Sequence, residues 1–119
     1  MVNKTVTLTF PVNSLQVLNF TPASYGYYNI YLPLVNADTQ LGTEITFVKC
    51  NSVVMTSTAS QVTPANQLWI GCQSGNTLWG QSGTSNALTA TNLIFYTSAK
   101  IVAIKNSSGS YGWYITNLN

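Results

Sequence analysis

The chain has 119 residues, which is the usual size of one domain and is long enough to bury a hydrophobic core. Hydrophobic residues make up 45% of it and indicate a globular chain, whereas charged residues make up only 5%, against about 25% in an average domain. The net charge of +2 comes from four lysines and two carboxylates, without any arginine. This balance offers no basic patch for nucleic acid, and no apolar run reaches the ~18 residues of a membrane-spanning helix, so neither nucleic-acid binding nor membrane insertion is expected.

Alternation of polar and apolar residues predicts β-strands along most of the chain. Residues 5–10 read TVTLTF, the period-two pattern of a strand with one buried face. No stretch places apolar residues at helical spacing over three turns, and turn-forming residues separate the alternating runs. The other predicted strands are residues 15–20, 27–32, 44–50, 53–58, 67–72, 92–97, 100–105 and 112–116.

Eight to nine short strands predict an all-β fold for residues 1–119, treated as a single domain. We expect an antiparallel β-sandwich, jelly-roll-like in topology. The last two strands predict a hairpin around residues 106–110, in which Gly109 is expected to adopt a positive φ. Residues 73–91 (QSGNTLWGQSGTSNALTAT) are the one long interruption and are expected to form a functional loop.

The residues that most hydrolytic enzymes need are missing. The chain has no histidine, which excludes Ser-His-Asp and Cys-His arrangements and histidine-based metal sites. Asp38 and Glu44 are the two carboxylates, and we interpret them as solvated loop charges rather than a catalytic pair. With Asn36 they make one weak cluster for calcium. The sequence therefore predicts a protein that is not an enzyme and that holds no metal or cofactor.

Two cysteines are too few for a disulfide scaffold. Cys72 shares the alternation phase of Leu68 and Ile70, so we interpret it as a small buried thiol. A disulfide between Cys50 and Cys72 remains the alternative.

Aromatic residues stand out against this sparse charge, with seven tyrosines and three tryptophans. Tyr and Trp are favoured where one side of the ring is shielded from water and the polar atom can still form hydrogen bonds. Cores, subunit interfaces and platforms for sugars offer such positions. Trp113 alternates in phase with Ile115, which predicts a core position, whereas Trp79 lies among small polar residues. The candidate ligand, receptor or subunit contacts are Trp79, Asn76, Gln81, Asn86, Tyr25 and Tyr27.

Five short motifs occur in a recognisable order. They are Leu32-Pro33, residues 41–49 (LGTEITFVK), 51–55 (NSVVM), 100–105 (KIVAIK) and 112–115 (GWYI). This order resembles the C-terminal heads of viral and phage fibre proteins, including collagen-like and tail-fibre-like proteins of large DNA viruses and their satellites.

The resemblance covers residues 32–119 and departs from the family pattern at residues 73–91. It implies a homotrimer of β-sandwich heads at the tip of a shaft, placed on the virion surface and attaching to a host glycan or protein receptor. It also implies that the chain is the C-terminal fragment of a longer fibre protein. Two other functions remain open: a minor capsid or decoration protein of a virion, and a secreted carbohydrate-binding module.

Overall fold

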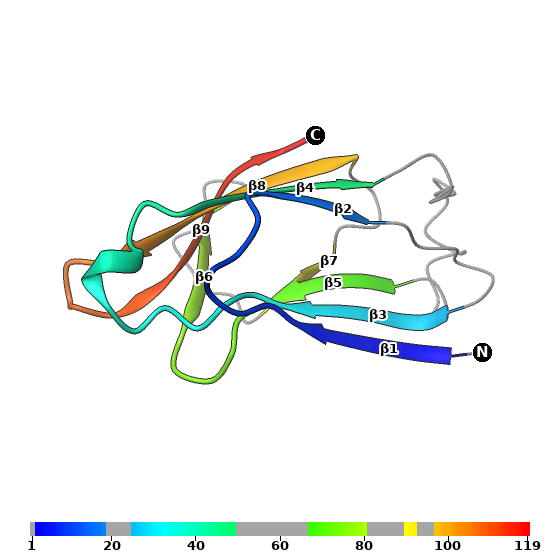
Figure 1. Cartoon of the computed structure of the whole chain (residues 1–119), viewed down its shortest axis with the longest axis horizontal. Helices are drawn as coiled ribbons and strands as arrows, with labels where there is room; N and C mark the ends of the chain where they lie inside the picture. Colours follow the sequence, from blue (N-terminus) through cyan, green and yellow to red (C-terminus); the bar gives the residue numbers. More distant parts are fainter. Residues whose placement is uncertain (1, 19–24, 50–66, 81–89, 93–96) are drawn as a thin grey trace.

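The computed structural model describes residues 2–18, 25–49, 67–80, 90–92 and 97–119. Within these residues the strands form two sheets that stack as the two layers of a sandwich (Figure 1). The predicted all-β sandwich of eight to nine strands is therefore confirmed.

One sheet has four strands and the other has five. The four-stranded sheet has the order β1 (Val2–Thr7), β3 (Tyr25–Tyr31), β5 (Gln67–Gly71) and β7 (Ala90–Asn92). The five-stranded sheet has the order β2 (Leu15–Leu18), β4 (Glu44–Lys49), β8 (Ser98–Lys105), β9 (Tyr111–Leu118) and β6 (Thr77–Gly80). A short 3-10 helix, η1 (Asp38–Gln40), precedes β4.

Among the described strands, each one from β1 to β7 is followed by a strand of the opposite sheet. On returning to their own sheet, the strands of β1–β3, β3–β5 and β2–β4 run in the same direction and form parallel pairs, whereas β5–β7 is antiparallel. Parallel neighbours need a long crossover connection, and here a strand of the opposite sheet supplies it.

The expected antiparallel, jelly-roll-like pairing is therefore wrong. A jelly roll pairs its strands antiparallel, whereas β6 and β9 form a fourth parallel pair in this sandwich. Antiparallel pairing occurs at β4–β8, β5–β7 and β8–β9. The last of these is the predicted hairpin, and Gly109 has the predicted positive φ, at 85°.

The loop expected over residues 73–91 is also wrong in part, because β6 occupies Thr77–Gly80 and β7 begins at Ala90. Gly75 precedes this short strand and Gly80 ends it, with positive φ values of 96° and 98°. Only four residues separate the two glycines, too few for alternation to stand out in the sequence. The strand predicted at residues 53–58 lies outside the described residues, as does most of the one predicted at 92–97.

The core lies between the two sheets, and Trp113 is at its centre. Its side chain is fully buried, its ring stacks on Phe10 with centroids 6.2 Å apart, and its Nε1 donates to the Pro33 carbonyl over 2.9 Å. The predicted core position of Trp113 is thus confirmed. The other buried apolar residues are Leu18, Ile30, Leu32, Val35, Ile45, Phe47, Ile70, Leu78, Ala99, Ile101, Ala103 and Ile115.

Candidate binding surface

The outer face of the five-stranded sheet carries two aromatic residues that lie outside the buried core, Trp79 and Tyr114. Strand alternation sends Leu78 and Trp113 inward, which leaves Trp79 and Tyr114 on the opposite face. The register places Trp79 beside Tyr114, and Tyr114 beside Val102. One row of side chains therefore crosses β6, β9 and β8 on the outside of the sandwich.

Trp79 and Tyr114 lie over glycines of the neighbouring strand. A Cβ atom built on Gly112 would lie 2.6 Å from Cζ3 of Trp79, and one built on Gly80 would lie 3.2 Å from Cζ of Tyr114. Each ring thus occupies the space that a side chain would otherwise fill, an arrangement that shields glycine in a sheet. Gly112 and Gly80 are buried as a result, while Tyr114 remains 41% exposed. We call Trp79 and Tyr114 the aromatic platform.

The opposite edge of the same sheet exposes aliphatic side chains. Leu15 and Val17 on β2 are 57% and 61% exposed, the largest values among the large hydrophobic residues that the structure describes. Val17 pairs with Val48 of β4, which extends the apolar surface toward the centre of the sheet. We call Leu15 and Val17 the aliphatic edge.

One ion pair lies between the platform and the aliphatic edge. Lys100 Nζ is 3.3 Å from a carboxylate oxygen of Glu44 on the adjacent strand. Both side chains are about half exposed, at 44% and 55%, so this pair is worth little stability. It does, however, leave this part of the face without net charge as far as the described side chains reach.

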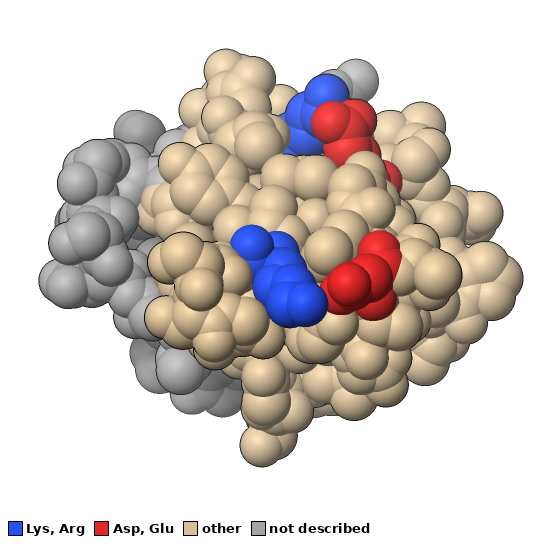
Figure 2. Space-filling view, turned by 90° about the vertical axis from the view of Figure 1, so that its left-hand side faces the viewer, with Lys and Arg blue, Asp and Glu red and all other residues tan. Residues whose placement is uncertain are grey.

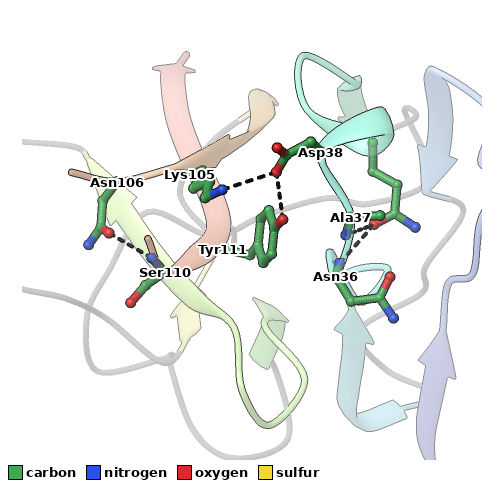
Figure 3. Close-up of polar contacts among 8 residues, drawn as sticks. Asn36, Ala37, Asp38, Lys105, Asn106, Ser110 and Tyr111 are labelled. Atoms are coloured by element: carbon green, nitrogen blue, oxygen red, sulfur yellow. Dashed lines mark hydrogen bonds and ion pairs between the residues drawn. The ribbon is translucent and has the colours of Figure 1, made fainter. Parts of the chain in front are cut away.

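A second charged group lies at the end of the sandwich where η1 meets the β8–β9 hairpin. Asp38 Oδ1 accepts a hydrogen bond from the Tyr111 hydroxyl over 2.6 Å and lies 3.2 Å from Lys105 Nζ (Figure 3). Lys105 Nζ also lies 5.2 Å from the centre of the Tyr111 ring. Viewed from this end, the surface carries two adjacent pairs of opposite charge among uncharged residues (Figure 2).

The three groups shift one another's pKa values. The Tyr111 hydroxyl, and then Lys105, lower the pKa of the Asp38 carboxyl. Asp38 in turn raises the pKa of both Lys105 and Tyr111. Asp38 and Lys105 are exposed to solvent and Tyr111 is partly buried. The three groups hold one another in their usual charge states, so the cluster ties η1 to the hairpin and presents no activated base or nucleophile.

Asp38 and Glu44, which with Asn36 make the weak calcium cluster considered from the sequence, each pair with a lysine, Asp38 with Lys105 and Glu44 with Lys100. Asn36 donates its backbone N–H to Gln40 Oε1 and thereby belongs to the turn around η1. Within the described ranges, no three His, Cys, Asp or Glu side chains gather as a metal site would require.

Asn76, one of the residues proposed from sequence, is held by the backbone. Its Oδ1 accepts from Val35 N–H over 2.8 Å, and its Nδ2 donates to the Val35 carbonyl over 2.9 Å. Gln73 Nε2 donates to the Leu32 carbonyl over 2.9 Å. The stretch from Leu32 to Val35 lies outside any strand and is buried except for Leu34, so its polar groups need such partners. Asn76 therefore stabilises this segment, and its amide has little capacity left for a ligand.

Two other candidates, Tyr25 and Tyr27, lie in a different sheet from Trp79. Tyr25 and Tyr27 belong to β3, in the four-stranded sheet, where they pair with Val2 and Gln67. Gln81 and Asn86 lie outside the described residues. Sequence reasoning passed over Tyr114 as a candidate, although the alternation that sends Trp113 inward also sends its neighbour outward.

Cys72 is a free, half-buried thiol packed against the core. Burial raises its pKa to about 12, against a smaller lowering by the backbone N–H of Trp113. A thiol held in its neutral form is a packing group rather than a nucleophile. Cys50 lies outside the described residues.

Comparisons of the chain with models of protein families, with curated proteins and with solved structures found no match. The described part of the chain contains no helix with the length and hydropathy needed to cross a bilayer.

Proposed function

We propose that this chain is the non-enzymatic head of a viral fibre protein, which forms a homotrimer on the virion surface and attaches to a host receptor or glycan. The observation that carries the proposal is the outer face of the five-stranded sheet, where apolar and aromatic side chains are exposed on a rigid scaffold. Such faces on otherwise polar proteins mark interaction sites.

The two ends of this face support two roles. The aliphatic edge exposes Leu15 and Val17 by more than half, and burial against a second copy would remove that apolar surface from water. Charged residues make up only 5% of the chain, so neighbouring copies repel one another weakly. The aromatic platform at the other edge is left for the receptor.

The resemblance to fibre heads bears on the fold more than on the receptor. Several of its motif residues are core residues of the sandwich: Leu32, Ile45, Phe47, Ile101, Trp113 and Ile115. A buried motif supports a shared scaffold, whereas attachment depends on exposed residues that differ between heads. The proposal of a virion location rests on this resemblance.

Two other functions are consistent with the same surface. A capsid decoration protein would use both ends of the face against other virion proteins. A secreted carbohydrate-binding module would use the aromatic platform as a monomer.

The first experiment measures the mass of the purified chain by sedimentation equilibrium at micromolar concentration. The proposal predicts a trimer of the 12.9 kDa chain. Changing Leu15 and Val17 together to Asp places two charges in the aliphatic edge and is expected to dissociate the trimer into monomers. A monomeric wild-type chain overturns the trimer, and a trimer unaffected by the double change moves the subunit contact elsewhere.

The second experiment measures attachment of the labelled trimer to a panel of bacterial, protist and animal cells. Saturable binding to some of them, competed by unlabelled chain, supports the fibre head. A trimer that binds none of the cells supports the decoration protein, and a monomer that binds isolated polysaccharide supports the secreted module.

A further inference from the structure

The structure points to a neutral sugar ring as the ligand of the aromatic platform, and we propose that Trp79 and Tyr114 stack on the apolar face of a pyranose. This inference rests on the proposed attachment function and names the chemical class of its receptor. It replaces the loop contact expected from the sequence with a contact on a strand surface.

The shape of the platform is the first argument. Gly112 lies beneath the edge of the indole ring and Gly80 beneath the tip of the phenol ring, because side chains at either position would collide with them. Rings that lie along a sheet present their broad faces outward. A pyranose in its chair form has a similarly broad face of C–H groups, and its contact with an aromatic face buries apolar area on both sides.

The rigidity of the platform is the second argument. Trp79 and Tyr114 are neighbours in a register fixed by backbone pairing, in strands whose alternate residues, Leu78 and Trp113, are fully buried. The two rings are therefore held in position before a ligand arrives. Preorganised contacts lose little conformational freedom on binding, which matters for a weak ligand such as a single sugar unit.

The electrostatics of the face are the third argument. Among the described side chains of this face, the charged ones, Glu44 and Lys100, neutralise each other at 3.3 Å, so they favour neither an anionic nor a cationic partner. Thr77 lies two residues before Trp79 on β6, and its hydroxyl is a partner for a sugar hydroxyl, whereas the Thr116 hydroxyl already donates to the Lys100 carbonyl over 3.1 Å. An apolar centre with a neutral, hydrogen-bonding border fits a neutral oligosaccharide better than a peptide that has to be steered by charge.

The test titrates the wild-type chain with cellotetraose, chitotriose and lactose, and follows the backbone and indole N–H resonances by NMR. We expect shifts confined to β6, β9 and the Trp79 indole for at least one sugar, and none with mannitol, which has the hydroxyls but no ring. Tyr114→Ala is expected to weaken binding about three- to tenfold, and Trp79→Ala to weaken it further. Trp79→Phe, which keeps a ring over Gly112, is expected to retain part of the affinity, and Thr39→Ala, an exposed position in η1, all of it.

The outcomes separate this inference from the proposed function. Cell binding that survives the loss of Trp79 and Tyr114, with no shift from any of the sugars, overturns the sugar platform and leaves the fibre head standing. Loss of the trimer in Tyr114→Ala and in Trp79→Phe also overturns the platform, because it assigns the rings to a subunit contact. Sugar binding by a monomer that attaches to no cell supports the platform and overturns the fibre head.

Discussion

The two faces of the five-stranded sheet place a tryptophan side chain in opposite environments. On the inner face, Trp113 is fully buried, stacked on Phe10 and bonded to the Pro33 carbonyl. On the outer face, Trp79 covers a glycine and keeps part of its surface in water. Trp113 and Trp79 lie on adjacent strands and point to opposite sides of the sheet. The side to which strand alternation directs an aromatic residue, more than its residue type, therefore decides whether it packs in the core or remains available to a binding partner.

The largest effect is expected from the inner face. Trp113→Ala leaves a large cavity and an unpaired Pro33 carbonyl, and is expected to cost about 3–5 kcal/mol of unfolding free energy. Trp79→Ala is expected to cost about 1 kcal/mol, since its ring is partly in water already. Urea unfolding followed by circular dichroism measures both, and equal losses would contradict the division between the two faces.

Gly112→Ala tests how closely β6, which carries Trp79, packs against β9, which carries Trp113. The added Cβ would collide with the Thr77 carbonyl oxygen as well as with the Trp79 ring, so β6 has to move away from β9. We expect a loss of about 1–3 kcal/mol. Gly109→Ala is the matched control: its positive φ is strained, at about 1 kcal/mol, but open space surrounds it. A smaller loss at Gly112 than at Gly109 would argue against close packing of β6 on β9.

Tyr114→Ala is expected to change stability little, by about 0.5–1 kcal/mol, because the side chain is 41% exposed and its strand is held by Trp113 and Ile115. The urea midpoint checks this directly. A loss above about 2 kcal/mol would show that the ring is part of the core and would remove it from the binding surface.

The smallest effect belongs to the charged end and depends on pH. The lowered pKa of Asp38 means that its ionised form stabilises the folded chain above the ordinary value of 3.8, and that this contribution is lost as the pH falls through the folded value. Asp38→Asn is therefore expected to lower the melting temperature slightly at pH 7 and not in strong acid. In a Tyr111→Phe background the difference should shrink, because the hydroxyl is the main partner of the carboxylate. An effect of the same size in acid would assign it to something other than the charge.

Alternation was a guide to most of the strands, but not to β6 and not to which strands are neighbours in the sheets. It predicts the β8–β9 hairpin, the core position of Trp113 and the extended segments, since each depends on residues close in sequence. The parallel pairs depend on which sheet the chain enters after each strand, and period two carries no information about that choice. For the same reason the sequence identifies Trp79 as a candidate but places it in a loop, and misses Tyr114, whose partner lies 35 positions earlier in the chain.

The order of strands in the five-stranded sheet also bears on how the chain folds during synthesis. β9 lies between β8 and β6 in the sheet, although it follows every other strand in the chain. While the ribosome is still adding residues 111–118, β6 has no neighbour in that sheet and Gly112 offers no surface for Trp79 to cover. Closure of the sandwich therefore waits for the last strand, and contacts so distant in sequence make folding slow. The aromatic platform forms after synthesis of the domain, so nascent chains do not display it.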